Sequence, residues 1–230
     1  MDKKFWSILA VIAVIFVGIF WLTSNKKSSP TSSNSQPTNH VEGSSPLGIK
    51  LVEYGDYECP YCSQYYPIVK QIAADYSTQI VFQFRHLPLT QLHPNAFAGA
   101  RAAEAAAVQN KFWEMHDTIY ANQDPTGKAG WVASSDPLNE YFINFASHLG
   151  LNITQFKQDY ASDKVNNLIN ADVNAFSKTG AQEATPAFFL DGKHISPTES
   201  VDSFKKLIDA EILIKVKASG SSSNPSNSKL

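Results

Sequence analysis

The only two cysteines of the 230-residue chain stand two residues apart, in the segment Cys59-Pro60-Tyr61-Cys62. Thiols at this spacing lie about one helical turn apart, so they are able to form and release a disulfide. Pro60 is well suited to the first turn of a helix, which places Cys59 at the helix N-terminus. Unpaired backbone N–H groups and the helix dipole favour an anion there. We therefore expect Cys59 to be the acidic, nucleophilic thiol and Cys62 to be the resolving thiol.

The same cysteine pair has two other interpretations. It could be inert, or it could form half of a zinc site that single histidines complete, for which the candidates are His86, His93 and His116. Structural zinc sites usually take closely spaced pairs of ligands, whereas these histidines are scattered along the chain. We therefore expect a redox-active disulfide, with no metal and no bound cofactor. A non-catalytic interaction protein is the remaining alternative.

An apolar segment at residues 5–22 follows the short start at residues 1–4. A helix of this length extends about 27 Å, close to the bilayer's hydrocarbon thickness of about 30 Å. Trp6 and Trp21 suit the two membrane interfaces, and no convincing cleavage site follows. We expect a cytoplasmic N-terminus at 1–4 and an uncleaved transmembrane signal anchor at 5–22, with a cleaved signal peptide as the alternative. The folded part is then expected outside the cytoplasmic membrane, where a disulfide stays oxidised.

Composition divides the rest of the chain into one domain between two polar segments. Residues 23–46 and 217–230 are dominated by small polar residues, Pro and Lys. Because such segments bury little apolar surface, we expect a disordered linker and a disordered tail. Residues 47–216 suffice for one domain with a sizeable core. The formal net charge of −2 gives no reason to expect a nucleic-acid partner.

The pattern of apolar residues in the domain predicts an α/β fold. Two β-branched segments flank a helix that begins at Pro60, which is the unit that builds a parallel strand pair. A run of helices follows, and Asp191-Gly192 is a hairpin turn between two short strands. This order indicates a thioredoxin-like fold with an inserted α-helical subdomain. The predicted elements are strand 49–54, helix 60–76, strand 79–85, insertion about 91–180, hairpin 187–195 and helix 200–215.

Five segments resemble the DsbA family of extracytoplasmic thiol-disulfide oxidoreductases, a branch of the thioredoxin superfamily. The resemblance extends over residues 48–213, and five segments in the family's order are far more specific than a lone Cys-x-x-Cys. It implies an oxidase that passes its disulfide to cysteine-containing exported proteins and is re-oxidised by a membrane quinone-linked partner. A reductase or isomerase with the same site is the alternative. The segments are VEYGDYECPYC at 52–62, FRHLPL at 84–89, HPNA at 93–96 leading into AAEAA at 102–106, FWEMHD at 112–117 and ATPAFF at 184–189.

The resemblance also implies roles for residues around the cysteines. Thr185-Pro186 matches a cis-proline segment whose backbone binds an extended substrate beside the disulfide. Glu53 matches a buried acid implicated in proton transfer at the resolving thiol, with a solvated strand-edge carboxylate as the alternative. Relatives carry a buried lysine near this acid, and Gln83 takes its place here. Because Tyr61 stands where strong oxidants often have histidine, we expect an oxidant of moderate strength.

Overall fold

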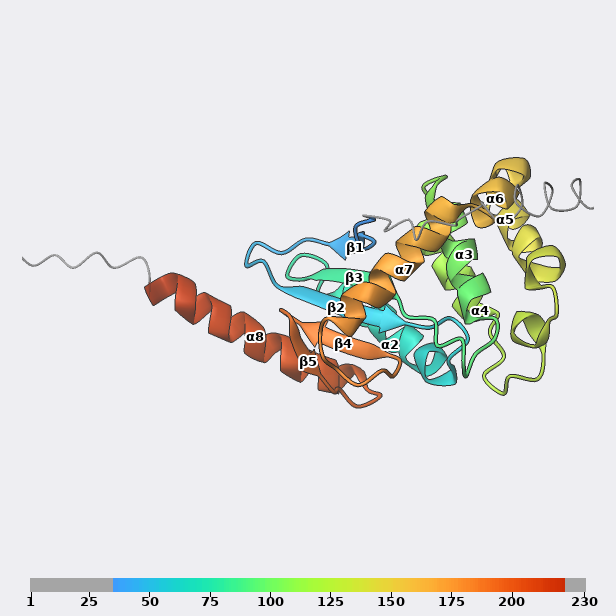
Figure 1. The fold of residues 1–230 in the computed structure, drawn as a ribbon. Helices are drawn as coiled ribbons and strands as arrows, with labels where there is room; N and C mark the ends of the chain where they lie inside the picture. The colour runs from blue at the N-terminus through green and yellow to red at the C-terminus, as the bar shows by residue number, and fades with distance from the viewer. Residues whose placement is uncertain (1–34, 222–230) are drawn as a thin grey trace, which may run out of the picture. The chain divides into compact units, whose positions relative to one another are not determined.

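One mixed five-stranded sheet forms the centre of the molecule (Figure 1). The computed structural model describes residues 35–221. The strands follow the spatial order β1-β3-β2-β4-β5, with β2 parallel to β3 and the other neighbouring pairs antiparallel. The four predicted strands correspond to β2 to β5, and β1 is an additional edge strand. Their bounds are β1 (His40–Gly43), β2 (Lys50–Gly55), β3 (Val81–His86), β4 (Ala187–Leu190) and β5 (Lys193–Ile195).

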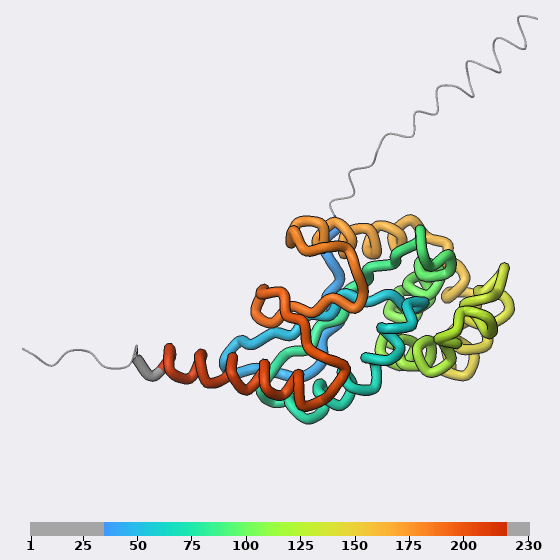
Figure 2. Tube along the Cα trace, turned by 90° about the horizontal axis from the view of Figure 1, so that it is seen from below, coloured from blue at the N-terminus to red at the C-terminus, as the bar shows by residue number. Residues whose placement is uncertain are grey.

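A helical insertion separates β3 from β4, as the sequence predicted. Most of its helices gather at one end of the sheet, coloured green to yellow in Figure 2, and α7 runs back over the strands in Figure 1. Asn152 and Ser162 cap α6 and α7, because each side chain accepts a hydrogen bond from a backbone N–H of the first turn. The helices are α2 (Pro60–Asp75), α3 (Ala96–Ala107), α4 (Phe112–Ala121), α5 (Ile143–His148), α6 (Ile153–Tyr160), α7 (Asp163–Ser177) and α8 (Val201–Ser221). A 3₁₀ turn (Gly130–Ala133) and a π-helical turn (Leu138–Phe142) precede α5.

The two faces of the sheet bury different helices. Alternate residues of β2 point to opposite faces, so Leu51 belongs to the large core that contains Ile72 of α2 and Phe204 of α8. Tyr54 belongs to a smaller core on the other side, where its ring meets Phe176 of α7 edge-on at 5.2 Å between centroids. The central strands are thus covered on both sides, which fixes the register at their carboxyl ends, where the cysteine segment begins.

The turn between β4 and β5 has the chemistry that the sequence predicted. Asp191 and Gly192 have φ values of 48° and 79°, and positive φ at both positions is the requirement of a type I′ hairpin turn. The Asp191 carboxylate also accepts the backbone N–H of Lys50 at 2.8 Å and pairs with Lys215 of α8 at 2.8 Å. One turn residue therefore ties the hairpin to β2 and to the C-terminal helix.

The linker predicted for residues 23–46 is wrong in its last part. His40–Gly43 is strand β1 and pairs with β3 at the sheet edge. Thr38 is buried, and its backbone N–H and hydroxyl both donate to the carboxylate of Asp172, at 2.8 and 2.6 Å. Polar contacts hold this segment, so a criterion based on apolar burial missed it.

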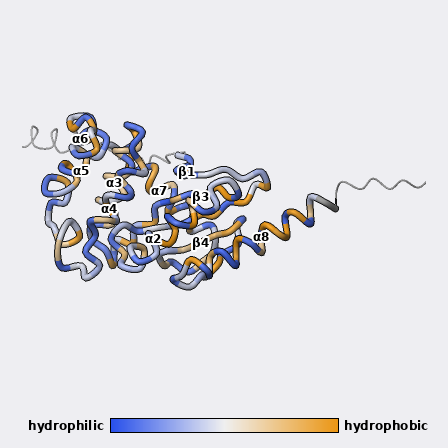
Figure 3. Tube along the Cα trace, turned by 180° about the vertical axis from the view of Figure 1, so that it is seen from behind, coloured by the Kyte–Doolittle hydropathy of each residue, from blue (hydrophilic) through white to orange (hydrophobic). Residues whose placement is uncertain are grey.

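The tail predicted from residue 217 is also wrong at its start, because α8 continues to Ser221. Neither Pro nor Gly interrupts the sequence between positions 201 and 219, so nothing local ends the helix earlier. Figure 3 shows α8 extending beyond the body of the domain with hydrophobic positions along it.

The anchor predicted at residues 5–22 and the cytoplasmic start at 1–4 lie outside the described residues. Within residues 35–221, no helix combines the length and the apolar character that crossing a membrane requires.

Candidate active site

The two cysteines lie where β2 gives way to α2. Cys59 is the N-cap residue of α2 and has an extended backbone, and Pro60 opens the helix. Both cysteines are free thiols, with Cys59 only 4% exposed and Cys62 fully buried. The Cys62 sulfur accepts the backbone N–H of Asp56 at 3.4 Å. The first thiol therefore borders the surface, and the second lies beneath it against the loop.

The environments of the two thiols separate their pKa values. The pKa of Cys59 falls to about 6, chiefly because the Cys62 thiol donates a hydrogen bond to its sulfur, and this outweighs the opposing effect of burial. The neighbouring Thr185 and the backbone N–H groups of Tyr61 and Cys62 lower the pKa of Cys59 further. Burial, followed by the neighbouring Cys59, raises the pKa of Cys62 well above its usual value. At neutral pH the pair holds one thiolate, at Cys59, which supports the predicted division of roles.

Thr185 and Pro186 lie against the first cysteine. Their peptide bond is cis, as expected from the resemblance, and Cys59 in its thiol form donates to the Thr185 carbonyl with an Sγ–O distance of 3.4 Å. An open groove of ≈ 250 Å³ runs past this contact. Tyr61 and Leu92 are 63% and 72% exposed beside it. The groove is lined by Cys59, Pro60, Tyr61, Leu89, Leu92, His93, Glu183, Ala184 and Thr185.

Glu53 is buried, so the alternative of a solvated strand-edge carboxylate is wrong. Desolvation by burial, and then the nearby Cys59 charge, raise its pKa to about 8. Glu53 lines a cavity of ≈ 40 Å³ whose wall also includes Tyr120 and the exposed Lys70. Since one water needs roughly 10–15 Å³ of such volume, the cavity has room for a few waters. Glu53 is thus a mostly protonated acid at neutral pH, next to space that water is able to occupy.

Gln83 does not face Glu53. The parallel register places Gln83 opposite Val52 and Glu53 opposite Phe84, so the two polar side chains point to different faces of the sheet. The Gln83 amide instead donates to the Thr38 carbonyl at 3.0 Å. The cationic side chain at the Glu53 cavity is Lys70, which also pairs with Asp117 of α4. The resemblance to the family drew attention to Gln83 on β3, whereas the lysine at this cavity comes from α2.

A buried carboxylate, Asp56, organises the loop before Cys59 and was not predicted. It accepts the backbone N–H groups of Glu58 at 2.8 Å and Leu89 at 2.9 Å. It also binds Nδ1 of His93 at 2.7 Å, and this hydrogen bond raises the pKa of His93 above its usual value. His93 in turn lines the groove that contains Cys59. The only sequence signal was the presence of Asp56 and His93 in two of the five family-like segments.

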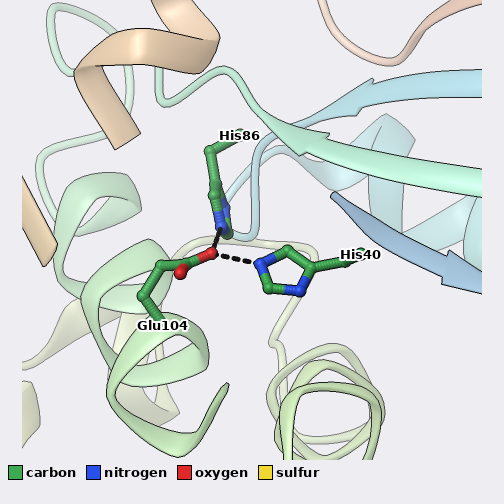
Figure 4. Close-up of side chains that lie close together, drawn as sticks. All are labelled: His40, His86 and Glu104. Carbon is green, nitrogen blue, oxygen red and sulfur yellow. Dashed lines mark hydrogen bonds and ion pairs between the residues drawn. The ribbon is translucent and has the colours of Figure 1, made fainter. Parts of the chain in front are cut away.

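A second polar cluster joins three elements away from the cysteines. His40 of β1 and His86 of β3 both direct Nε2 at one oxygen of Glu104 on α3, at 2.5 and 2.7 Å (Figure 4). Burial alone would raise the pKa of Glu104, but the hydrogen bonds from His40 and His86 outweigh it and lower the pKa to about 2. The cluster therefore holds an ionised carboxylate in the interior.

Within residues 35–221, this cluster is the single grouping of histidine, cysteine and acidic side chains with the spacing for a metal ion. Its geometry is that of hydrogen bonds, because both nitrogens donate to the same oxygen. His86 Nδ1 is buried without a hydrogen-bond partner, whereas a metal-bound histidine usually donates its second N–H. The cluster is therefore a set of hydrogen bonds that clamps β1, β3 and α3 together. Of the three histidines considered for a zinc site, His93 lines the groove beside Cys59, but within residues 35–221 no grouping with metal-ligand spacing includes a cysteine.

Comparisons with known proteins give a family and a fold. The family described as Thioredoxin matches residues 35–210 of the chain. The Na(+)/H(+) antiporter NhaA 3 of Salinispora tropica is 38% identical over 155 residues, which are 67% of this chain and 22% of that protein. NhaA 1 of Mycolicibacterium gilvum is 35% identical over 172 residues, or 74% of this chain and 26% of that protein. The chain thus spans only a fifth to a quarter of these curated relatives.

Two solved structures share the architecture of this domain. BdbD from Bacillus subtilis, in its oxidised form, superposes with a TM-score of 0.64 and 23% identity, over 78% of this chain and 97% of that chain. The thiol-disulfide exchange protein alpha-DsbA2 from Wolbachia pipientis gives a TM-score of 0.62 and 19% identity, over 75% and 86% of the two chains. The predicted thioredoxin-like fold with a helical insertion is confirmed.

We predict that alkylation of Cys59 in the reduced protein rises with pH through a midpoint near 6, because the thiolate is the reactive form. Thiolate absorbance and iodoacetamide kinetics measure this midpoint. Cys62→Ala removes the donor to the Cys59 sulfur and raises the midpoint, whereas Cys62→Ser keeps a hydroxyl donor and raises it less. A midpoint near the ordinary cysteine value of about 8.5 in the native protein would contradict the assignment.

We predict that Glu104→Gln lowers the free energy of unfolding at pH 7 by roughly 1.5–3 kcal/mol, because a buried charge-assisted hydrogen-bond cluster is lost. In the native protein the stability due to Glu104 is present above pH 4.5, where the unfolded carboxyl ionises, and is lost as pH falls toward about 2. Urea titrations at several pH values measure both effects. The exposed Glu199→Gln is the control, and equal stability of the two variants would refute the clamp.

Proposed function

We propose that this chain, which belongs to the thioredoxin family and has a DsbA-like fold, is a thiol-disulfide oxidoreductase that acts as a dithiol oxidase of exported proteins. The observation that carries the proposal is the placement of the two cysteines, with Cys59 at the N-terminus of α2 bordering a groove and Cys62 buried, which displaces their pKa values in opposite directions. A thiolate that is stabilised in the reduced protein makes the disulfide a better oxidant.

The reaction begins with the oxidised pair. A thiolate of the client attacks the Cys59 sulfur, a mixed disulfide forms, and the bond between Cys59 and Cys62 breaks with Cys62 leaving as a thiolate. The second client thiolate then attacks the client sulfur of the mixed disulfide, and Cys59 leaves as a thiolate. The client gains a disulfide and the enzyme gains two electrons, so no bound cofactor takes part.

Glu53 is suited to protonate the leaving thiolate of Cys62. Its pKa of about 8 keeps it mostly protonated at neutral pH, and its charge is close enough to raise the pKa of Cys62. The proton that Glu53 gives up is replaced through the cavity beside it, which Lys70 also lines. This assignment follows the family expectation for the acid, with the cavity as the additional support from this chain.

Client binding is assigned to Thr185 and Pro186. The Thr185 carbonyl lies 3.4 Å from the Cys59 sulfur, so an extended client segment that pairs with this backbone brings its cysteine to the reacting sulfur. Leu89, Leu92 and Tyr61 line the groove and offer apolar contacts that do not select one sequence. This arrangement supports a broad range of clients.

We also propose that residues 5–22 anchor the chain in the cytoplasmic membrane, that residues 35–221 lie on the extracytoplasmic side, and that a quinone-linked membrane protein re-oxidises the site. The apolar sequence of 5–22 and the need of a disulfide for a non-reducing compartment support the placement. The curated relatives are named as antiporters, but the match spans 22% of the first of them. We propose no ion transport for this chain.

Cys62→Ala, produced in cells, is predicted to accumulate mixed disulfides between Cys59 and extracytoplasmic proteins, because the resolving thiol is gone. Non-reducing gels followed by mass spectrometry identify the adducts. The Cys59→Ser,Cys62→Ala double variant is the matched control and is expected to form none. If the single variant also captures nothing, dithiol oxidation of exported proteins is the wrong function.

The Cys59–Cys62 couple is predicted to have a reduction potential above about −250 mV, more oxidising than that of thioredoxin at about −270 mV. Equilibration with glutathione buffers measures it. Tyr61→His is expected to raise the potential further, because an imidazole stabilises the thiolate better than a phenol does. A potential in the thioredoxin range would instead indicate a reductase.

A further inference from the structure

The cysteine segment lacks a cation of its own. Tyr61, between the cysteines, is 63% exposed, and a phenol has no positively charged form to offer. Of the residues that line the groove beside Cys59, His93 is the one whose side chain is able to carry a positive charge. It comes from the loop between β3 and α3, 34 positions after Cys59 in the sequence.

The His93 ring is held in place from two sides. Its backbone N–H donates to the Leu89 carbonyl at 2.9 Å, and its Nδ1 lies 2.7 Å from the Asp56 carboxylate. Asp56 is itself fixed, being 1% exposed and bonded to two backbone N–H groups. The same loop is tied to Cys59, whose backbone N–H donates to the Asp56 carbonyl at 3.2 Å. The imidazole and the sulfur are thus positioned by one residue.

We propose that His93 is a positioning residue that holds a positive charge over the Cys59 side of the groove and thereby sets the oxidising strength of the disulfide. This inference rests on the proposed function, because it concerns the redox pair that performs it. Without this charge, the buried Asp56 carboxylate would lose its ion pair with His93. His93 therefore supplies, from a loop distant in the sequence, the positive charge that Tyr61 does not supply within the cysteine motif.

The charges around His93 agree with this role. Asp56, Glu58 and Cys59 all face it, and Glu183 lines the same groove. The hydrogen bond from His93 to Asp56 is the main reason for its raised pKa, and burial opposes it. The Cys59 thiolate raises the pKa of His93 further. Because coupling between two titrating groups is reciprocal, the protonated His93 must favour the Cys59 thiolate by the same free energy.

The test compares His93→Gln, which keeps a hydrogen-bond donor for Asp56 but no charge, with the native protein. Thiolate absorbance is expected to show a rise in the Cys59 pKa of about one unit. The glutathione equilibrium is expected to shift toward the protein disulfide by up to about tenfold, or about 30 mV for two electrons. His93→Lys, which restores the charge, should return both values toward native. His148→Gln, at an exposed histidine on α5, should leave both unchanged.

A second measurement needs no variant. In the native protein, NMR titration of the His93 ring should give a higher pKa in the reduced form than in the disulfide form, because only the reduced form carries the thiolate. Equal His93 pKa values in the two forms, or a His93→Gln protein with native Cys59 pKa and glutathione equilibrium, would overturn the proposal. These results are separate from the proposed function, which fails if the native protein does not oxidise dithiol clients at all.

Discussion

The unequal ionisation of the two cysteines is the property on which the site depends: the Cys62 thiol lowers the pKa of Cys59, and burial raises the pKa of Cys62 itself. Cys62 is fully buried, so its own ionisation is costly and it remains a donor. Cys59 caps α2, where backbone N–H groups also favour an anion. If Cys62 were as accessible as Cys59, either thiol could ionise, and the pair would no longer have a fixed nucleophile and a fixed resolving thiol. The burial of Cys62 and the position of Cys59 at the helix N-terminus are therefore both needed to keep the charge on Cys59.

Three buried carboxylates connect the loops and edges that the apolar core does not hold. Asp56 joins the loop before Cys59 to the loop after β3, through backbone N–H groups and His93. Asp172 binds Thr38 and the backbone N–H of His86, and Glu104 binds His40 and His86. Each carboxylate accepts several hydrogen bonds, which offsets the cost of burying its charge. The helical insertion is thereby fixed to the sheet by polar contacts as well as by packing.

The sequence was most informative where local chemistry determines the structure. A proline after Cys59 predicts the start of α2, and Asp191-Gly192 predicts the hairpin turn, because both depend on the backbone preferences of the residues themselves. The strand β1 escaped prediction because its contacts are polar and come from α3 and α7, far along the chain. The pairing of Asp56 with His93 and the placement of Gln83 away from Glu53 are tertiary facts, set by strand register and loop packing. The sequence contains these residues but does not show which of them meet.

Tyr61 occupies an unusual position for a residue inside a redox motif, since it is 63% exposed between two buried cysteines. A replacement at this position exchanges solvent contacts and leaves the core packing as it is, so its cost in folding stability is small. The neighbouring positions lack this freedom, because Pro60 starts a helix and the cysteines fill the interior. Evolution is therefore able to sample many residues at position 61. Single substitutions there adjust the reduction potential of the cysteine pair and each leave a folded protein.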